Sequence, residues 1–488
     1  MIKRSSKKKK LLIVLGVLLV LGGVLGFIAW YKFFREEPQR AFKDEADRFK
    51  YGSIGAENDR GLPYWIWLVL PRAFPDLLPG SGGWKSFGLV WEEGQEVPAG
   101  FSKKVIGFPR IANNCAICHT GTWRAKDDEV PNVVAAAPSH TTDVQGIIRF
   151  LTAAAKDPRF NADTLMPLIE RETELSFLDQ VLYRFVIIPF TRKTLLEQEE
   201  QFDWMNRPGM PHWGKGRDDP MNLTKYFMTN MPVDNSTGQA DFPSVWNLGV
   251  RKGTPEVPRY LNWSCDTPAV RSVLIDSALG LGARAGAPFL KRMEELDNFL
   301  SALPPPKWPF TGEHAIKPAL ATAGKAIYDR DCASCHEPGR EFTNKPIPIA
   351  EIQTDRERLD TWTQEAADKA NRAVKDLGIT RPDMVKNDGY CSPPLDGLWL
   401  RAPYLHNGAV PTLRELLEPV EKRTKRFYRG YDVYDPINVG FVTQGPEAER
   451  VGWLLDTAVR GDSNVGHLYG TTLSTSDKEA LLEYLKSL

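Results

Sequence analysis

The chain has 488 residues, of which 42% are hydrophobic, so it can form two or three compact domains and is not a mainly disordered protein. Lysine plus arginine and aspartate plus glutamate balance at 62 each, and this balance gives no reason to expect nucleic-acid binding. The basic residues are unevenly placed, because the first ten residues hold six of them and no acidic one.

The N-terminal segment joins this basic cluster to an apolar run. Residues 1–10 form a predicted cytoplasmic tail, and residues 11–31 form a predicted transmembrane anchor. Leu11 to Trp30 continue for 20 residues without a charge, which is about 30 Å of helix. Because lysines stay on the cytoplasmic side, the rest of the chain is expected on the periplasmic side of the inner membrane. A cleaved signal peptide is the alternative, but the run is long for one and no A-x-A site follows.

Two segments share the pattern Cys-x-x-Cys-His. They are Cys115-Ala116-Ile117-Cys118-His119 and Cys332-Ala333-Ser334-Cys335-His336. This order suits covalent haem, because two thiols join one porphyrin and the next residue places an imidazole under its iron. A zinc site made from two Cys-x-x-Cys pairs would not need a histidine after each pair. The sequence therefore predicts two haem c groups, at a first haem site (Cys115, Cys118, His119) and a second haem site (Cys332, Cys335, His336).

The chain before and around the first site divides by composition. Residues 32–100 form a predicted extension, in which four prolines between 63 and 79 break any long helix. Residues 101–303 form the predicted first haem domain. Its amphipathic helical stretches, separated by turn-rich insertions, lie at 143–155, 164–187 and 290–303.

A Pro-rich linker at 304–314 separates this part from the predicted second haem domain, residues 315–488. The second domain is expected to open with a helix at 319–331. It is expected to close with a helix at 476–488, in which Ser476 and Glu479 have capping-box spacing. The predicted fold class is mainly α, with two cytochrome c-like haem domains that carry long loop insertions and follow one transmembrane helix.

Cys265 and Cys391 remain once the haem cysteines are assigned. Haem is attached to such sites outside the cytoplasm, in a compartment where disulfides are stable. A bridge between these two cysteines and a pair of buried free thiols are both compatible with the sequence.

Several further segments form a pattern along the chain. In chain order they are NNCAICHTG (113–121), WGKGRD (213–218), DFPSVWN (241–247), LDG (395–397) with APYLHNG (402–408), and GHLYG (466–470). In this order they resemble segments of the di-haem c-type cytochromes, which include the bacterial di-haem cytochrome c peroxidases and, more closely, the rubber oxygenases. The resemblance covers most of the chain after residue 100. It implies two helical haem domains face to face, one haem with two protein ligands and the other able to bind oxygen or peroxide.

Two features depart from this family. The rubber oxygenases are secreted, whereas this chain is expected to be tethered. The family usually has Gly and Asn after the aromatic residue in the segment 262–266, where this chain has Cys265. The sequence therefore leaves the identity of the substrate open.

The sixth ligands of the two irons decide what such a protein does. For the second site the resemblance implies His467, from a loop before the C-terminal helix, with His406 as the alternative. His406 has a second interpretation, a hydrogen bond to a haem propionate or to the backbone. For the first site, His140 follows His119 by 21 residues and is a candidate ligand, as in the resting peroxidases, or the position is open, as in the oxygenases.

Other candidate site residues are aromatic or basic. Trp246 and Trp263 lie between the two sites in sequence, and the family places an aromatic residue between its haems, although packing is the alternative role for both. Arg217 and Arg401 are candidates for pairing with buried propionates, because a guanidinium contacts two oxygens at once, and solvated surface arginine is the alternative. A Ca²⁺ ion between the domains is a further candidate cofactor.

The sequence favours a membrane-anchored di-haem c-type cytochrome. It is expected to transfer electrons and to carry out peroxidase-like or oxygenase-like chemistry at the Cys115/Cys118 haem. The alternative is a pure electron carrier in which both irons have six ligands. The expected partners are redox proteins of the membrane or periplasm, with peroxide or O₂ as a small substrate.

Overall fold

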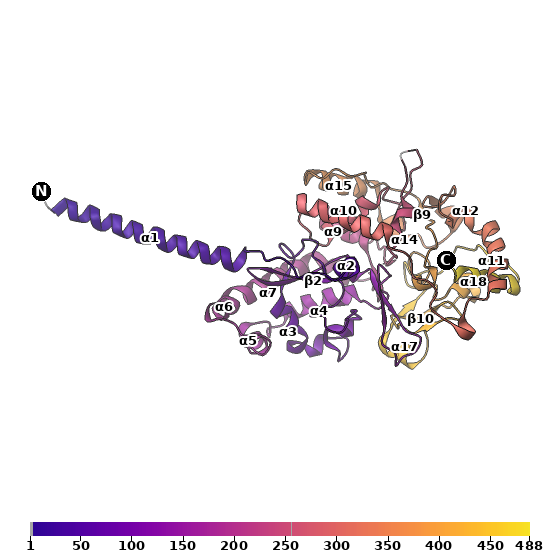
Figure 1. Cartoon of the computed structure of the whole chain (residues 1–488), viewed down its shortest axis with the longest axis horizontal. Helices are drawn as coiled ribbons and strands as arrows, with labels where there is room; N and C mark the ends of the chain where they lie inside the picture. Colours follow the sequence, from indigo (N-terminus) through magenta and orange to yellow (C-terminus); the bar gives the residue numbers. More distant parts are fainter. Residues whose placement is uncertain (1–2, 255) are drawn as a thin grey trace.

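The computed structural model of the chain describes residues 3–254 and 256–488 (Figure 1). Met1 and Ile2, at the start of the predicted cytoplasmic tail, lie outside the described residues. Helices account for 45% of the chain and strands for 11%, in agreement with the mainly α fold class. One helix projects away from a body in which the remaining helices and short strands are packed together (Figure 1).

The projecting helix is α1 (Lys3–Phe33), and its part from Lys9 to Phe33 is long and apolar enough to cross a membrane. Its large apolar side chains from Leu11 to Phe27 are exposed. The last turn is fixed to the body. Arg110 donates a hydrogen bond to the Phe33 carbonyl (3.2 Å), and Lys32 forms an ion pair with Asp179 (2.6 Å).

The predicted extension is part of the core beneath the first haem domain. Trp67 and Trp84 stack with ring centres 4.8 Å apart, and both pack in one buried cluster with Phe150 and Leu165. A three-stranded antiparallel sheet, with strand order β1-β3-β2, lies against the helices α2 and α3. The elements are α2 (Glu45–Tyr51), β1 (Leu62–Pro63), α3 (Tyr64–Ala73), β2 (Phe101–Ile106), β3 (Phe108–Asn113), α4 (Val144–Lys156), α5 (Ala162–Ile169), α6 (Phe177–Leu182) and α7 (Ile188–Phe202).

The helix predicted at 143–155 is confirmed as α4, and Asp143 caps it by accepting a hydrogen bond from the Gly146 amide. The single helical stretch predicted at 164–187 is wrong, because a turn separates α5 from α6. Ser176 starts a new helix there by accepting a hydrogen bond from the Asp179 amide. A π-helical turn at Tyr183–Ile187 then joins α6 to α7.

The helices of the middle and C-terminal parts agree with the other predicted spans. The prediction at 290–303 corresponds to α10, and the prediction at 319–331 corresponds to α11. These and the remaining helices are α8 (Pro220–Leu223), α9 (Val270–Gly280), α10 (Ala287–Ala302), α11 (Pro318–Asp331), α12 (Ala333–His336), α13 (Ile349–Ile352), α14 (Glu357–Thr361), α15 (Gln364–Asp376), α16 (Leu413–Leu416), α17 (Pro446–Val451) and α18 (Thr475–Leu485).

The last helix, α18, begins at Thr475, and its N-cap lies two residues before the predicted one. Ser474 is the N-cap and accepts a hydrogen bond from the Asp477 amide (3.2 Å), so the assignment of Ser476 and Glu479 as the capping pair is wrong. Glu479 forms an ion pair with Arg414 instead. α18 packs closely on α11 at Gly324, where an added Cβ would lie 1.9 Å from the Ala480 carbonyl oxygen.

The largest buried cluster contains residues from both sides of the predicted 304–314 linker, including Met293, Trp399 and Leu481. Within the linker, Trp308 packs edge to face on Trp399 and on Tyr434. The two predicted haem domains therefore share an apolar interface. The boundaries at 101–303 and 315–488 stay predictions.

Short antiparallel two-stranded ribbons connect the helices. They position loops rather than form a central sheet. The strand pairs are β4 (Thr120–Trp123) with β5 (Asn132–Ala135), β6 (Arg217–Asp218) with β7 (Ala240–Asp241), β8 (Pro346–Pro348) with β9 (Gly389–Cys391), β10 (Arg426–Arg429) with β13 (Trp453–Asp456), and β11 (Tyr434–Asp435) with β12 (Gly440–Phe441).

Candidate haem sites

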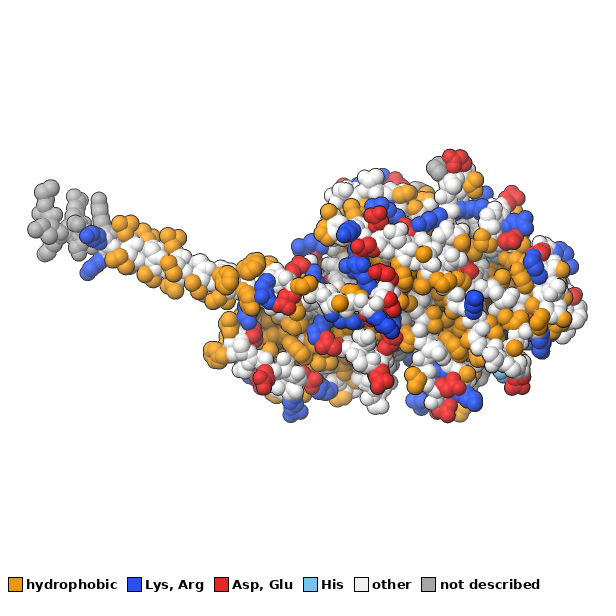
Figure 2. Space-filling view, in the orientation of Figure 1, with side chains coloured by type: hydrophobic (Ala, Val, Ile, Leu, Met, Phe, Trp, Pro, Cys, Tyr) orange, Lys and Arg blue, Asp and Glu red, His pale blue; other side chains and the backbone are white. Residues whose placement is uncertain are grey.

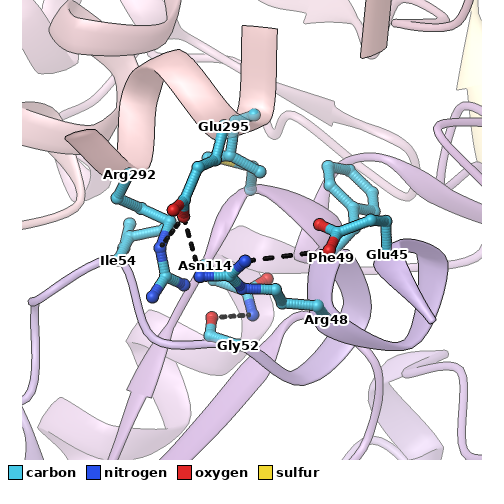
Figure 3. Close-up of a pocket in the computed structure, with 10 residues that line it drawn as sticks. Glu45, Arg48, Phe49, Gly52, Ile54, Asn114, Arg292 and Glu295 are labelled. Carbon is cyan, nitrogen blue, oxygen red and sulfur yellow. Dashed lines mark hydrogen bonds and ion pairs between the residues drawn. The ribbon is translucent and has the colours of Figure 1, made fainter. Parts of the chain in front are cut away.

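The first haem site begins at the end of β3, where Asn114 fixes the backbone before Cys115. The Asn114 side chain accepts a hydrogen bond from the Ala116 amide (2.9 Å) and donates one to the Gly52 carbonyl (3.0 Å). Figure 3 shows this contact beside an ion pair between Arg48 and Glu295 (2.7 Å) that joins α2 to α10. The loop that carries Cys115 is therefore held between two helices.

The two motif histidines each form a hydrogen bond with a proline carbonyl. His119 donates from Nδ1 to the Pro243 carbonyl (2.9 Å), and His336 donates from Nδ1 to the Pro393 carbonyl (2.8 Å). A carbonyl can only accept, so each Nδ1 carries the proton and each Nε2 has a free lone pair. Burial lowers the pKa of His119 to about 4 and also lowers the pKa of His336. Both rings are therefore neutral and suited to bind a metal.

A cavity of about 370 Å³ opens next to the first site. Cys115, Cys118 and His119 all line it, so the two thiols and the imidazole face one space. Among the residues that the structure describes, His119 is the only histidine on this lining. Its apolar lining includes Phe202, Met221, Leu223, Phe227, Met228, Leu274 and Met384.

Two buried arginines, Arg251 and Arg358, and the partly buried Arg401 also line this cavity. Each has at least one buried guanidinium nitrogen without a hydrogen-bond partner in the protein. Burial, with the nearby charge of Arg401, lowers the pKa of Arg251 to about 10, so its guanidinium is still charged at neutral pH. Arg401 is paired with Asp396 (2.9 Å), and Arg251 lies 3.9 Å from the same carboxylate. Arg358 forms no ion pair with the described residues, and a buried cation without a partner needs an anion. Haem propionates are such anions, so the lining fits a porphyrin in both its apolar and its charged parts.

At the second haem site, the rings of His336 and His467 have centres 6.3 Å apart and are inclined by 46°. A metal–imidazole bond is about 2 Å long and the ring centre lies about 1 Å behind the nitrogen, so two imidazoles on one iron have centres about 6 Å apart. The observed separation therefore fits one iron between the two rings. Burial, followed by the neighbouring His336, lowers the pKa of His467 to about 3, which keeps its ring neutral.

The loop that carries His467 is held by the buried guanidinium of Arg423. Arg423 donates hydrogen bonds to the carbonyls of Asn464 (2.7 Å), Gly466 (2.9 Å) and His467 (3.2 Å). These contacts fix a strained turn, since His467 has a φ of 48°, in the left-handed region. The orientation of His467 therefore depends on an arginine that the sequence did not indicate.

The other two candidate histidines each stack on an aromatic ring. His140 stacks on Phe441 with ring centres 3.8 Å apart and does not line the cavity next to His119. His406 stacks on Tyr390 (3.9 Å), and burial, followed by the charge of Arg358, holds its pKa well below the usual value. His140 follows Ser139, whose amide donates to the Cys118 carbonyl (3.0 Å), and the buried Nε2 of His140 has no hydrogen-bond partner in the described protein, so ligation by His140 stays a prediction. His467 rather than His406 faces His336.

The two candidate tryptophans have different surroundings. Trp263 lines the cavity, and its carbonyl accepts a hydrogen bond from the Cys391 amide (2.8 Å) in β9, the strand that leads to Pro393. Trp246 is fully buried and donates to the Asp396 carbonyl (2.9 Å). Trp263 therefore touches both the cavity and the chain segment that supports His336, whereas Trp246 is packed within the core.

Arg217 and Arg401, the two arginines expected at propionates, also differ. Arg217 is fully buried, pairs with Asp462 (2.5 Å) and donates to the carbonyls of Trp213 and Asn407. It does not line the cavity, so protein acceptors take the place of the expected propionate. Arg401 does line the cavity, and its pairing with a propionate stays a prediction. Sequence reasoning missed Arg251 and Arg358, for which no local motif gives a signal.

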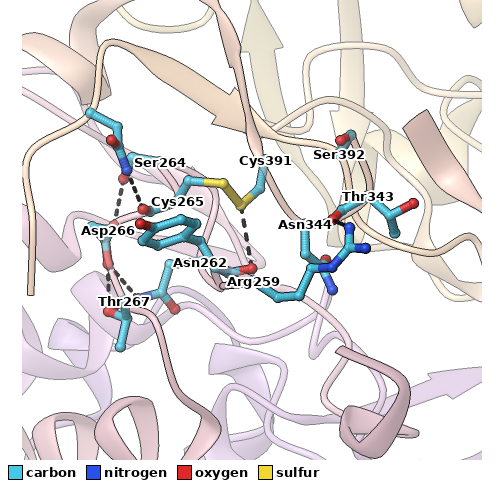
Figure 4. The surroundings of a disulfide bond; sticks show 12 residues. Arg259, Asn262, Ser264, Cys265, Asp266, Thr267, Thr343, Asn344, Cys391 and Ser392 are labelled. Carbon is cyan, nitrogen blue, oxygen red and sulfur yellow. Dashed lines mark hydrogen bonds between the residues drawn. A yellow bond between two sulfur atoms is a disulfide. The ribbon is translucent and has the colours of Figure 1, made fainter. Parts of the chain in front are cut away.

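Cys265 and Cys391 form a disulfide with their Cα atoms 5.0 Å apart (Figure 4). Of the two alternatives that the sequence left open, the structure therefore contains the bridge. Asn262 donates to Asp266 (2.7 Å) in the same loop, and Asn387 donates to the Cys265 carbonyl (2.5 Å). The bridge ties the Trp263 loop to β9, between the first and second sites.

A Ca²⁺ site finds no support in the part of the chain that the structure describes. There, no group of three or more His, Cys, Asp or Glu side chains is arranged to hold a metal ion. The cysteines and histidines of the two Cys-x-x-Cys-His motifs do not form such a group either.

Comparison with known proteins supports a haem c protein. Residues 389–428 match the family described as RoxA-like, cytochrome c-like, and a cytochrome c-like domain implies covalently bound haem c. The matched segment contains Pro393, Arg401 and His406. The chain is also similar to two proteins of Sinorhizobium fredii. Uncharacterized protein y4iJ is 25% identical in an alignment 592 residues long, which covers 94% of this chain and 93% of that protein. Uncharacterized protein y4iM is 30% identical over 233 residues, which cover 41% of this chain and 49% of that protein.

Proposed function

We propose that this protein is a membrane-anchored, periplasmic di-haem cytochrome c in which the two sites have different tasks. The second site transfers electrons, and the first site reacts with peroxide or O₂. The observation that carries this proposal is the contrast between the two motif histidines. His336 faces a second imidazole at 6.3 Å, whereas the cavity that His119 lines has no second histidine among the described residues.

At the second site, the protein offers an imidazole on each side of one iron position. His336 is oriented by the Pro393 carbonyl, and the loop of His467 is held by Arg423. A site whose two ligands are fixed in this way keeps its coordination during oxidation and reduction, so little structural rearrangement opposes electron transfer.

At the first site, the protein offers one imidazole, and the lining of its cavity has no second histidine among the described residues. Pro243 fixes the ring of His119, and apolar side chains such as Phe227 and Leu274 keep the cavity poorly hydrated. When bound, haem would supply the single-electron and oxygen chemistry at this position. Asp218 is a buried carboxyl on the cavity lining, and burial raises its pKa to about 7, so it can hold or release a proton beside the reacting molecule.

Trp263 is the residue best placed to connect the sites in this proposal. It lines the cavity of the first site, and its carbonyl contacts the Cys391 amide, two residues before Pro393. An aromatic ring between two redox centres shortens the gap that an electron must cross. The expected donors and acceptors are redox proteins of the membrane or periplasm.

The anchor in the proposal is α1, with the basic N-terminal residues in the cytoplasm and the body in the periplasm. Protease added to intact spheroplasts tests this topology, because it should digest the body but leave the cytoplasmic tail. Full protection of the body would mean that the orientation is wrong.

The number of haems is tested by removing one attachment site. Cys115→Ala combined with Cys118→Ala should leave one covalent haem per chain, because each Cys-x-x-Cys-His site binds its own porphyrin. A pyridine haemochrome assay against protein concentration counts them. Two covalent haems in this variant would contradict the assignment.

A pure electron carrier is the second candidate, and one observation favours it. Met221, Met228 and Met384 line the cavity next to His119, and a methionine thioether is a sixth ligand in many cytochromes c. If one of them binds the iron, both sites have six ligands and only electrons are exchanged.

Electron paramagnetic resonance (EPR) of the oxidised protein decides between the two candidates. The proposed enzyme gives one high-spin signal and one low-spin signal of equal weight, and the high-spin signal disappears when azide or peroxide is added. Two low-spin signals that do not respond to azide would overturn the enzyme and favour the carrier.

A further inference from the structure

One surface of the body exposes large apolar side chains that a water-soluble domain would be expected to bury. It is formed by α6, the π-helical turn and the start of α7, and is called the α6–α7 face here. Phe177 is 82% exposed, Phe185 69% and Phe190 66%. Leu178, Val181 and Val186 are exposed beside them. Contiguous exposed apolar residues of this kind mark an interaction surface.

The exposed residues form a stripe because of their spacing. Phe177, Val181 and Phe185 follow one another at intervals of four, as do Val186 and Phe190, and residues four apart lie on the same side of a helix. The other side of the same segment is also apolar and is buried in the core, through Tyr183, Ile187, Ile188 and Leu195. A helical segment that is apolar on both sides needs an apolar environment beyond its own core.

The α6–α7 face adjoins the end of α1. Lys32, in the last turn of α1, pairs with Asp179 of α6 (2.6 Å). Phe33 packs edge to face on Phe108 (6.2 Å), and Phe108 packs in the same way on Tyr183 (6.3 Å). Figure 1 shows α6 at the end of the body from which α1 projects, and Figure 2 shows hydrophobic side chains gathered at this end.

The charges of this segment suit a phospholipid surface. From residue 180 to residue 196 the chain has three basic residues, Arg184, Arg192 and Lys193, and no acidic one. Asp179, just before this stretch, is paired with Lys32, and Arg184 contacts Asp163 (2.7 Å). Basic residues beside exposed aromatic ones are typical of helices that lie in the interface of an anionic bilayer.

We propose that the α6–α7 face is a second membrane contact, in which Phe177, Phe185 and Phe190 enter the lipid interface beside the anchor. This inference rests on the proposed role of α1 as a membrane anchor. Two contacts, a spanning helix and an interfacial one, hold the body in one orientation. α7 leads from this face to Phe202 on the cavity lining, which spans about 22 Å of helix. The cavity of the first site is therefore held at a fixed height above the bilayer.

Site-directed spin labelling of the full-length holoprotein tests this inference. Phe185→Cys and Phe190→Cys are labelled with a nitroxide and reconstituted in vesicles of phosphatidylcholine and phosphatidylglycerol. Leu18→Cys reports on α1, and Ile437→Cys, at a residue that is 59% exposed between β11 and β12, is the matched control. Collision rates with O₂, which concentrates in lipid, and with a nickel chelate, which stays in water, are compared.

The labels at 185 and 190 should collide at least severalfold more with O₂ relative to the chelate than the label at 437 does. If they are as accessible to the chelate as position 437 while position 18 is in lipid, the inference fails and the anchor stands. If position 18 is also in water, the anchor itself fails. Low access of both reagents to 185 and 190 would mean that protein covers this face, which also overturns the inference. An unchanged Soret spectrum shows that each variant is folded.

Discussion

The imidazole rings of His336 and His467 face each other with their centres 6.3 Å apart, the spacing expected for two ligands of one iron. His467→Gly should therefore leave an open or water-bound iron at the second site. Its reduction potential should rise, and reduced protein should bind one additional carbon monoxide per chain. Optical spectroscopy and a potentiometric titration measure both effects.

His406→Gly is the matched control for this variant. His406 stacks on Tyr390 and does not face His336, so its loss should change packing while the low-spin signal persists. If His406→Gly opens the iron and His467→Gly does not, the two assignments are exchanged. If neither opens it, the sixth ligand is another residue.

Arg423 should control how firmly His467 is held, without contacting the iron position. Arg423→Met removes the donors to the carbonyls of Asn464, Gly466 and His467, and unpaired buried carbonyls cost about 1–3 kcal/mol of unfolding free energy. We expect a mixture of low-spin and high-spin EPR signals from the second site. Arg423→Lys, which keeps the charge and some donors, should restore part of the low-spin signal. A destabilised protein with an unchanged low-spin signal would mean that Arg423 is merely structural.

The parts of this structure that the sequence predicted are those set by local spacing. The periodicities at 143–155, 290–303 and 319–331 correspond to helices, because their apolar faces pack in the expected way. The prediction of one helix at 164–187 is wrong, because Ser176 caps a new helix within this stretch. The periodicity of apolar residues does not indicate where one helix ends and the next begins. At the C-terminus, the N-cap of α18 is Ser474 rather than Ser476. Both residues are serines near the start of the helix, so the sequence alone does not distinguish them.

The candidate sites divide in the same way. The Cys-x-x-Cys-His motifs are contiguous in sequence, so they could be recognised without a fold. The acceptors Pro243 and Pro393 and the arginines Arg251 and Arg358 reach the sites through tertiary packing, which leaves no local pattern. Tertiary packing also pairs Arg217 with Asp462, although the sequence predicts a propionate as its partner.

The Cys265–Cys391 bridge should stabilise the interface between the two sites. Cys265→Ser combined with Cys391→Ser removes a link across a sequence separation of 126 residues, which should cost about 2–5 kcal/mol of unfolding free energy. Guanidinium unfolding followed by circular dichroism measures this loss. Wild-type protein after mild reduction of the bridge is the control and should lose a similar amount. Equal midpoints for the variant and the oxidised wild type would contradict this role.

Asp218 should make anion binding at the first site depend on pH. Burial raises its pKa to about 7, with Asp219 adding to the shift and Arg358 opposing it. The carboxyl is therefore mostly neutral below pH 7 and negative above it. Azide should bind the oxidised first site several-fold more weakly above pH 7, because the ionised carboxylate repels it. This step should vanish in Asp218→Asn. A step that persists in the variant would assign it to another group.

The central claim is that one site is closed by two imidazoles and the other is open, and carbon monoxide binding to the reduced wild-type protein tests it most directly. Covalent haem is counted by pyridine haemochrome, and carbon monoxide is titrated against the Soret band of the same sample. We predict two haems and one bound carbon monoxide per chain. Binding of none, or of one to each haem, would contradict the division of tasks between His119 and the pair of His336 and His467.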